Sequence, residues 1–358
     1  MRRFVRVLFF TVLFISVEKG LAQKGLDTPT HMLRVYEDDD FINIWGQGSD
    51  NAYTNGTRLD YFYNPDHPSR LFIDRALPKA GEGSLNTYGW GIVQLMYTPD
   101  DLKSSEYQPH DYPYSGALYA THTLYSYNPG SKFSLQNELV LGVVGPAALA
   151  GPTQRLVHRW EGYDIPQGWS HQFRNDLLLN LNVTAEKQLA HAGQGLEIIG
   201  GSQLSAGTMQ NSLTVYPLIR FGNMTSYFNG FISQFATTGK NQYGGRKGQF
   251  YFFAKPAAQL ILTNALLQGG VFTHNPNLHP LPSSKPDPVT GQTPVSATLE
   301  TTPPQPYPPL NKLETSLTYG IVFSSGNFGL YFSQITSSAQ LKGLYCHQTG
   351  NISLYFSW

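Results

Sequence analysis

The 358-residue sequence has little charge, little methionine and one cysteine. Charged residues make up 13% of the chain, and 24 acidic residues balance 24 basic ones. Nucleic-acid-binding proteins normally carry a basic excess for phosphate contacts, so this balance argues against that class and predicts no nucleic-acid partner. The lone Cys346 excludes a disulfide framework and a cysteine-based zinc site. The sequence also lacks the Gly-x-Ser-x-Gly elbow, the His-Glu-x-x-His helix and the Gly-Lys-Ser/Thr phosphate loop.

Long hydrophobic runs are absent as well. The apolar run Phe9–Val17 follows Arg2, Arg3 and Arg6, and small residues stand at Gly20 and Ala22. A membrane-spanning helix needs about 20 apolar residues, and this run is shorter. We therefore predict that residues 1–22 are a signal peptide, that the mature chain starts near position 23, and that no helix anchors it.

What the chain does have is aromatic residues, 22 Tyr and 21 Phe, in segments that alternate between apolar and polar positions. In one segment Leu177 and Leu179 alternate with Asp176 and Asn180, and similar segments recur up to Trp358. Period-two alternation indicates strands with one apolar and one polar face. A soluble sandwich would bury the apolar face, whereas a transmembrane barrel would turn it outward to the lipid.

Three features favour the barrel: segments of about ten residues recur through the chain, Tyr and Phe gather at segment ends, and the last segment ends in an aromatic residue. The predicted fold is all-β, a transmembrane antiparallel β-barrel of about 12 strands formed by residues 23–358 as one unit. Thirteen segments qualify as strands: 31–37, 55–63, 88–97, 115–127, 133–144, 172–188, 194–205, 211–222, 249–263, 266–273, 312–324, 327–336 and 350–357. Closed bacterial barrels have even strand numbers, so at least one segment is wrong and we favour twelve.

Two connections between these segments are long. Residues 274–311 are rich in proline, which no strand interior tolerates. Residues 145–171 include a short predicted helix between Pro152 and Glu161. This connection and residues 37–60 hold most of the candidate chemistry.

The acidic run Glu37-Asp38-Asp39-Asp40 closes the first predicted strand. Adjacent carboxylates repel one another unless they are solvated or bind a cation, so the run indicates either a solvated turn or an oxygen-ligand Ca²⁺ site. A second motif, Tyr53-Thr54-Asn55-Gly56, fits a hairpin turn. Thr54 shares parity with Arg58 and Asp60, which predicts that it points into the barrel.

A third motif, Asp111-Tyr112-Pro113-Tyr114, has the residues of a turn. In the fourth, Gln154 and His158 are four residues apart and so share one face of a helix. A histidine there could serve as a general base, because its ordinary pKa is near neutrality, or it could be structural.

Taken together and in this order, the motifs resemble the lipid A 3′-O-deacylases of the Gram-negative outer membrane. The resemblance covers about residues 33–189 and is carried by Glu37-Asp38-Asp39-Asp40-Phe41, Tyr53-Thr54-Asn55-Gly56, Tyr97-Thr98-Pro99, Asp111-Tyr112-Pro113-Tyr114-Ser115-Gly116, Gly145-Pro146, Gln154-x-x-x-His158 and Gly168-Trp169-x-x-Gln172. It implies a twelve-stranded barrel that hydrolyses the 3′-linked acyloxyacyl ester of lipid A in the outer leaflet with the help of Ca²⁺.

The resemblance also implies roles for individual residues. His158 would activate water, Gln154 would orient the histidine or the ester, and Thr54 would line the site. Asp39 would bind the metal and take part in catalysis, with Asp38 beside it at the metal and the substrate. Asp164, or as second choice Glu161, would complete the site. The chain departs from the family at position 38, where the family usually has Asn, so metal affinity and ester preference could differ.

Two other functions remain open from the sequence. The protein could be a different outer-membrane esterase or phospholipase that shares this site, or a non-catalytic barrel such as a channel or an adhesin. The sequence leaves the oligomeric state open.

Overall fold

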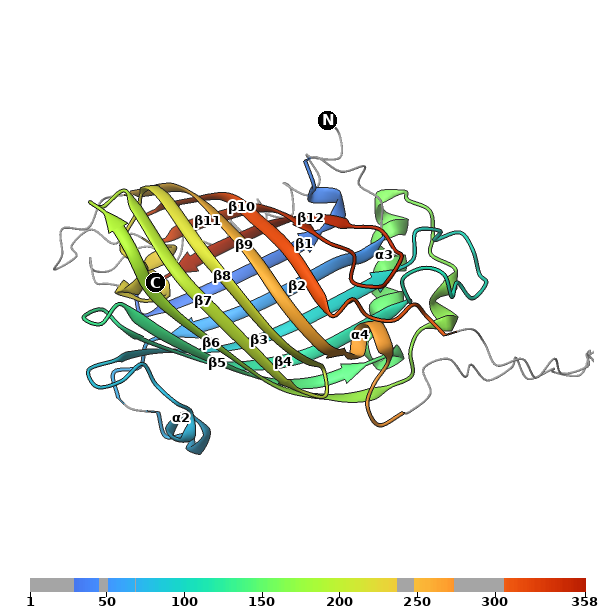
Figure 1. The fold of residues 1–358 in the computed structure, drawn as a ribbon, viewed down its shortest axis with the longest axis horizontal. Coiled ribbons are helices and arrows are strands. Elements are labelled where there is room, and N and C mark those ends of the chain that lie inside the picture. The colour runs from blue at the N-terminus through green and yellow to red at the C-terminus, as the bar shows by residue number, and fades with distance from the viewer. Residues whose placement is uncertain (1–28, 45–50, 68, 237–247, 274–305) are drawn as a thin grey trace, which may run out of the picture.

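The computed structural model describes residues 29–44, 51–67, 69–236, 248–273 and 306–358. Twelve strands close into one barrel in which each strand pairs antiparallel with its neighbours and β1 pairs with β12 (Figure 1). The strands are β1 (His31–Asp39), β2 (Ala52–Tyr63), β3 (Leu85–Thr98), β4 (Ser115–Asn128), β5 (Phe133–Val144), β6 (Asp176–Ala192), β7 (Leu196–Gly207), β8 (Gln210–Asn223), β9 (Gly248–Asn264), β10 (Leu313–Ser325), β11 (Phe328–Ser337) and β12 (His347–Ser357). The predicted fold class and the choice of twelve strands are confirmed.

One of the thirteen predicted strands, 266–273, is wrong. Its first residues belong to the short helix α4 (Ala265–Gln268), which begins after β9. The Asn264 side chain accepts a hydrogen bond from the Leu266 amide at 2.9 Å, and Gly269 ends the helix with φ of 83°. Leu266 and Leu267 are buried, and a short buried apolar run has the same composition in a strand and in a helix.

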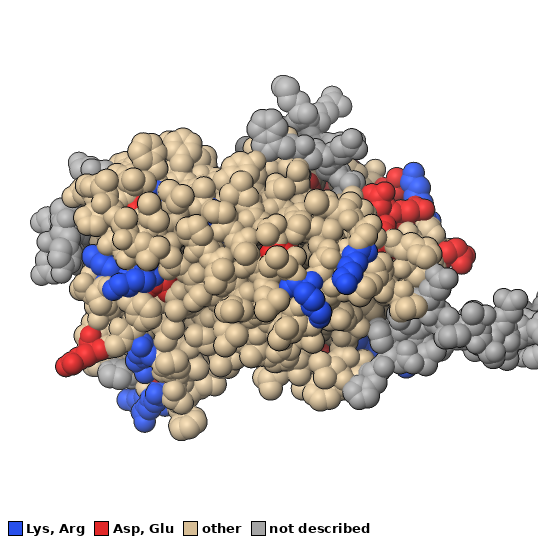
Figure 2. All heavy atoms as spheres, viewed as in Figure 1, with Lys and Arg blue, Asp and Glu red and all other residues tan. Residues whose placement is uncertain are grey.

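The alternation along each strand separates an apolar exterior from a polar interior. Leu177 and Leu179 of β6 are 48% and 53% exposed, whereas Asp176 and Asn180, which flank them, are buried. Most of the surface in Figure 2 is neither acidic nor basic. This arrangement is the reverse of a soluble sandwich and confirms the barrel interpretation. Among the described residues, no helix is both long and apolar enough to cross a membrane.

The barrel has two different ends. One end, called the α3 end here, carries η2 (Asp40–Ile42), η3 (Pro146–Ala148), α3 (Ala150–Glu161), η4 (Gly168–His171) and α4. The other, the termini end, holds the first and last strand residues and carries α2 (Phe72–Ala76), η5 (Tyr227–Asn229) and η6 (Ile232–Gln234). Figure 1 shows α2 and α3 at opposite ends. The predicted signal peptide and most of the Pro-rich connection 274–311 lie outside the described residues.

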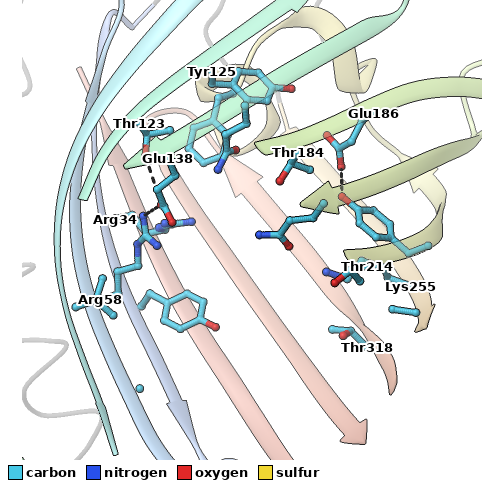
Figure 3. Close-up of a pocket in the computed structure, with 18 of the residues that line it drawn as sticks. Arg34, Arg58, Thr123, Tyr125, Glu138, Thr184, Glu186, Thr214, Lys255 and Thr318 are labelled. Carbon is cyan, nitrogen blue, oxygen red and sulfur yellow. Dashed lines mark hydrogen bonds and ion pairs between the residues drawn. The ribbon is translucent and has the colours of Figure 1, made fainter. Parts of the chain in front are cut away.

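A polar cavity of about 580 Å³ lies in the lumen (Figure 3). Arg34, Arg58 and Glu138 lie together on one side, where Arg58 and Glu138 form an ion pair at 2.6 Å, and Glu186 and Lys255 lie on the other. An apolar cluster fills each mouth: the cluster at the α3 end includes Tyr112, Leu267, Leu310 and Leu341, and the cluster at the termini end includes Met32, Ile232, Phe235 and Tyr355. The described lumen is therefore a polar cavity with an apolar cluster at each end.

Some outward-facing residues of β4 and β5 are polar because a connection covers them. The β2–β3 connection, which contains α2, places Asp74 Oδ1 at 2.6 Å from His122 Nε2. Further along, the carbonyl of Pro78 accepts a hydrogen bond from Asn137 Nδ2 at 2.9 Å. The connection thus shields from lipid the positions that break the apolar exterior.

Candidate active site

Helix α3 packs on the outer wall of the barrel rather than in the lumen. Gln94 of β3 donates from Nε2 to the carbonyl of Ala148 at 2.7 Å, and Gln94 alternates with the lumen-lining Val93 and Leu95. At Gly116 of β4, an added Cβ would meet the Ala150 Cβ at 2.3 Å, so only glycine allows the helix this close. The helix therefore covers the outer wall at β3 and β4.

The two faces of α3 are reversed relative to a helix on a soluble protein. Gln154 and His158 are buried against the barrel, whereas Leu156, Val157 and Trp160 are 67%, 44% and 54% exposed. Since the barrel exterior is the lipid-facing surface, this arrangement places polar groups beneath the helix and apolar groups toward lipid. The helix and its i, i+4 pair were predicted; its docking on the outer wall was not.

The hydrogen bonding of His158 defines the protonation of its ring. Its Nδ1 lies 2.5 Å from the carbonyl oxygen of Asp164. A carbonyl only accepts, so Nδ1 must carry the proton and Nε2 of the neutral ring keeps its lone pair. Asp164 thus contacts the histidine through its backbone, while its side chain is 66% exposed and pairs with Lys103 at 3.0 Å. Glu161, the alternative acid, is the last residue of α3.

Trp169 of η4 fixes the side chain of Gln154. Its Nε1 donates to Gln154 Oε1 at 2.7 Å, and both residues are buried. Because Oε1 accepts this bond, the NH₂ group of the Gln154 amide, which is a hydrogen-bond donor, points away from Trp169. The Trp169 carbonyl accepts from Gln172 Nε2 at 3.1 Å, and the Trp169 ring packs on Tyr114 at a centroid distance of 5.1 Å. The motif Gly168-Trp169-x-x-Gln172 therefore supports the glutamine.

The acidic run at the end of β1 divides between the two sides of the wall. Asp38 faces the lumen and accepts hydrogen bonds from Tyr36, from Tyr53 at 3.3 Å and from Asn351 at 2.9 Å. Its two neighbours alternate to the outer side, where Asn55 Nδ2 lies 2.5 Å from Glu37 Oε1 and 3.2 Å from Asp39 Oδ2. The outward pair is thus Glu37 and Asp39, not Asp38 and Asp39. Sequence reasoning did not single out Glu37 or Asn55, although period two could have indicated both.

Thr54 lies at an irregularity of β2. The register with β3 shifts between Tyr53 and Asn55, which leaves Thr54 as a bulge residue. Its hydroxyl is buried and lies 2.7 Å from that of Thr98. The simple parity with Arg58 and Asp60 therefore does not fix its direction. Thr54 instead stands in the wall next to Asn55, the partner of the outward acidic pair.

Aromatic rings link the strand ends to the helix. The Phe41 ring, in η2 after β1, lies 6.2 Å from that of Tyr163, which lies 5.7 Å from the ring of His158. Asp40 points elsewhere, since its Oδ2 accepts from the Asn51 amide at 3.0 Å. The structure thus joins the β1 end to His158 through two aromatic contacts, and Tyr163 is a contact that the sequence motifs missed.

The Asp111-Tyr112 motif joins two connections at the α3 end. Tyr345 donates to Asp111 Oδ1 at 2.9 Å, and Tyr112 donates to the Tyr345 carbonyl at 3.3 Å. Burial raises the pKa of Tyr112 to about 12, so its hydroxyl stays protonated and can donate at neutral pH. This motif positions loops and brings no reactive group to α3.

A closed antiparallel barrel with an even strand number, an apolar exterior and a polar interior is the architecture of bacterial outer-membrane proteins. The family model described as "Outer membrane protein LpxR" matches residues 7–358. The chain therefore belongs to the LpxR family, and the predicted family, the lipid A 3′-O-deacylases of the Gram-negative outer membrane, is confirmed together with the enzyme class and the outer-membrane location.

One solved structure shows the same fold over most of the chain. LpxR from Salmonella typhimurium superimposes with a TM-score of 0.66 at 16% identity, over 91% of this chain and 100% of that one. Weaker likenesses include the beta domain of the Bordetella autotransporter BrkA, at TM-score 0.38, 9% identity and coverage of 93% and 100%. The translocator domain of the autotransporter NalP from Neisseria meningitidis gives 0.36, 9%, and coverage of 99% and 96%. No curated protein sequence matches this chain.

The outward acidic pair has donors suited to a hard cation. Within the described ranges, no group of three or more His, Cys, Asp and Glu side chains is arranged to hold a metal. Glu37 and Asp39 nevertheless offer carboxylate oxygens on one side of the wall, where the Asn55 amide contacts both and the Phe41 amide donates to Asp39 Oδ1 at 2.7 Å. Ca²⁺ takes six to eight oxygens, including carbonyl and water oxygens, so two carboxylates supply part of a set that such a site requires.

Proposed function

We propose that this lipid A deacylase hydrolyses the 3′-linked acyloxyacyl ester with water activated by His158, in a Ca²⁺-dependent site between α3 and the outer wall. The observation that carries the proposal is the Nδ1 contact of His158 with the Asp164 carbonyl, because it leaves Nε2 as the basic nitrogen of a buried ring. Lipid A in the outer leaflet is the proposed partner, and the exposed apolar face of α3 supports contact with its acyl chains.

The reaction follows from the groups present. Water attacks the ester carbonyl carbon while His158 Nε2 accepts its proton, which gives a tetrahedral intermediate. The intermediate collapses as the carbon–oxygen bond to the sugar breaks, and His158 returns the proton to the leaving alkoxide. The products are the free acyloxyacyl acid and a 3′-hydroxyl on lipid A. Gln154, held by Trp169, donates from its NH₂ group to the oxygen that becomes negative.

The calcium proposal rests on Glu37 and Asp39. These two residues would hold the ion, with Asn55 and the Thr54 hydroxyl beside them. A bound divalent cation supplies positive charge for a developing oxyanion and for the substrate's phosphate groups. Asp38 is less suited to direct ligation because it faces the lumen, where Tyr36, Tyr53 and Asn351 already donate to it.

The structure bears differently on the two alternative functions, the channel and the phospholipase. A channel would need an open lumen, and in the described part of the chain apolar clusters fill both mouths. A phospholipase that uses the same site differs only in the ester it accepts. Substrate identity therefore has to be measured.

The deciding experiment is mass spectrometry of lipid A from cells that express the wild type, His158→Gln or an empty vector, followed by purified enzyme on lipid A and on phospholipid vesicles. We expect the wild type alone to release the 3′-linked acyloxyacyl group. Release of fatty acid from phospholipid but not from lipid A would favour the phospholipase. An active His158→Gln enzyme would refute the role of the histidine while leaving the family activity intact.

A further inference from the structure

The ladder between β8 and β9 is interrupted in mid-strand by two facing prolines. Val215 pairs with Ala258 and Ile219 with Ala254, so the register places Pro217 opposite Pro256, yet no pair forms between these two positions in the described strands. Proline has no backbone N–H to donate, and strand interiors normally exclude it. Pro217 remains in register with β7 and Pro256 with β10, so the interruption is confined to one seam.

The outer wall is hollowed at this seam. A groove of about 920 Å³ crosses β6 to β10 and is lined mostly by small or apolar residues, which include Leu189, Gly200, Val215, Pro217, Pro256 and Ala258, with Lys187 as a charged exception on the outer side. Elsewhere on the same strands, large side chains such as Phe221 and Leu260 project outward, at 62% and 47% exposure. At Gly200 an added Cβ would come within 2.9 Å of the Leu189 side chain. The groove therefore exists because glycine and proline stand where neighbouring positions carry large residues.

The floor of the groove is polar. Glu186, Tyr216, Ala257 and Ser316 line both the groove and the lumen cavity, so only this layer separates the two spaces. Tyr216 donates to Glu186 at 2.9 Å, and Lys255 Nζ lies 5.1 Å from the Tyr216 ring (Figure 3 shows Glu186 and Lys255). An apolar ligand in the groove would meet mostly small and apolar side chains, with Lys187, Ser202 and Thr315 among them, and a hydrogen-bonded barrier beneath that keeps it out of the lumen.

We propose that this β8–β9 groove binds one acyl chain of a membrane lipid. The occupant follows from continuity: the groove opens on the apolar exterior, whose surrounding solvent is acyl chain. An extended chain fits a groove that crosses five strands, since neighbouring strands are about 4.8 Å apart and the span is roughly 20 Å. The groove lies on β6–β10, whereas α3 covers β3 and β4, so the proposal is independent of the deacylation mechanism.

The test is photo-crosslinking of the full chain in phosphatidylethanolamine liposomes that contain a phospholipid with a diazirine in one acyl chain. We expect several-fold more label on the β8 and β9 peptides than on the lipid-facing positions of β11. Gly200→Leu fills the groove and should abolish the excess, while Ala206→Leu adds a leucine to the same strand outside the groove and should leave it unchanged. Correct folding is checked by heat-modifiable gel migration.

If Gly200→Leu fails to fold, Ala258→Leu fills the same groove from β9. Equal labelling of all lipid-facing strands would overturn the proposal. So would an excess that persists in both filled variants, because the label would then report lipid contact without a groove.

Discussion

The β1–β4 wall and the β6–β10 wall are built from the same alternating strands, yet they carry different surfaces. On the first, the outward positions include Glu37, Asp39 and Asn55, and α3 covers the neighbouring strands. On the second, the outward positions are mostly apolar and the main feature is the seam at Pro217 and Pro256. The comparison shows that alternation decides which side of the wall a residue faces, whereas the connections decide whether an outward residue meets lipid or protein.

The largest expected difference between the two walls is the effect of replacing a histidine on the rate of ester release. His158→Gln removes the proposed base and should lower the rate of ester release about 10² to 10⁴-fold, the usual contribution of a general base. His191→Gln changes an exposed histidine of β6 and should leave the rate unchanged. Turnover of purified lipid A by both variants measures the contrast. Near-normal turnover of His158→Gln would show that this residue is structural.

The next largest effect distinguishes the outward-facing carboxylates of β1 from the carboxylate that faces the lumen. Asp39→Asn and Glu37→Gln remove charge from the outward pair and should each reduce the rate strongly and raise the Ca²⁺ concentration needed for half-maximal activity. Asp38→Asn keeps an acceptor for its tyrosine donors inside the lumen and should retain most of the activity. The assay is ester release in chelator, followed by stepwise return of Ca²⁺.

Two outcomes would contradict the metal proposal. Full wild-type activity in chelator would exclude a divalent cation. A dead Asp38→Asn beside an active Asp39→Asn would show that the lumen side, not the outer side, holds the ion.

These contrasts also show what the sequence could predict. Period two predicted the strands and the apolar exterior, and it could have separated Asp38 from its neighbours; the choice of twelve strands came from the even strand numbers of bacterial barrels. The bulge at Thr54 could not be predicted, because it depends on the register that β3 imposes. The same holds for Asp164, which reaches His158 through a backbone carbonyl that any residue could supply. The strand prediction for residues 266–273 was wrong because the Asn264 N-cap determines that a helix forms there, whereas the composition of the segment does not.

A smaller effect is expected from the support of Gln154. Trp169→Phe keeps the ring that packs on Tyr114 but removes the Nε1 donor to Gln154. A buried neutral hydrogen bond contributes roughly 0.5–1.5 kcal/mol, so we expect kcat to fall a few-fold, with KM little changed. Trp90→Phe on the outer wall of β3 is the matched control and should keep normal kinetics. A change in KM alone would indicate that Trp169 serves substrate binding instead.

The smallest expected effect compares an apolar residue on the exposed face of α3 with an apolar residue on the outer face of β8, which no helix covers. If Leu156 contacts the acyl chains of the substrate, Leu156→Asn should raise KM for lipid A about fourfold, which corresponds to roughly one methylene group of lost burial. Leu213→Asn makes the same change at an exposed position of β8 and should leave KM unaltered. Kinetics in mixed micelles provide the measurement, with a short-chain ester substrate as a second readout. That substrate does not reach Leu156 in this proposal, so its KM should be equal in both variants. A parallel rise in both KM values would mean that Leu156→Asn disturbs the docking of α3, and the apolar face would then serve the helix rather than the substrate.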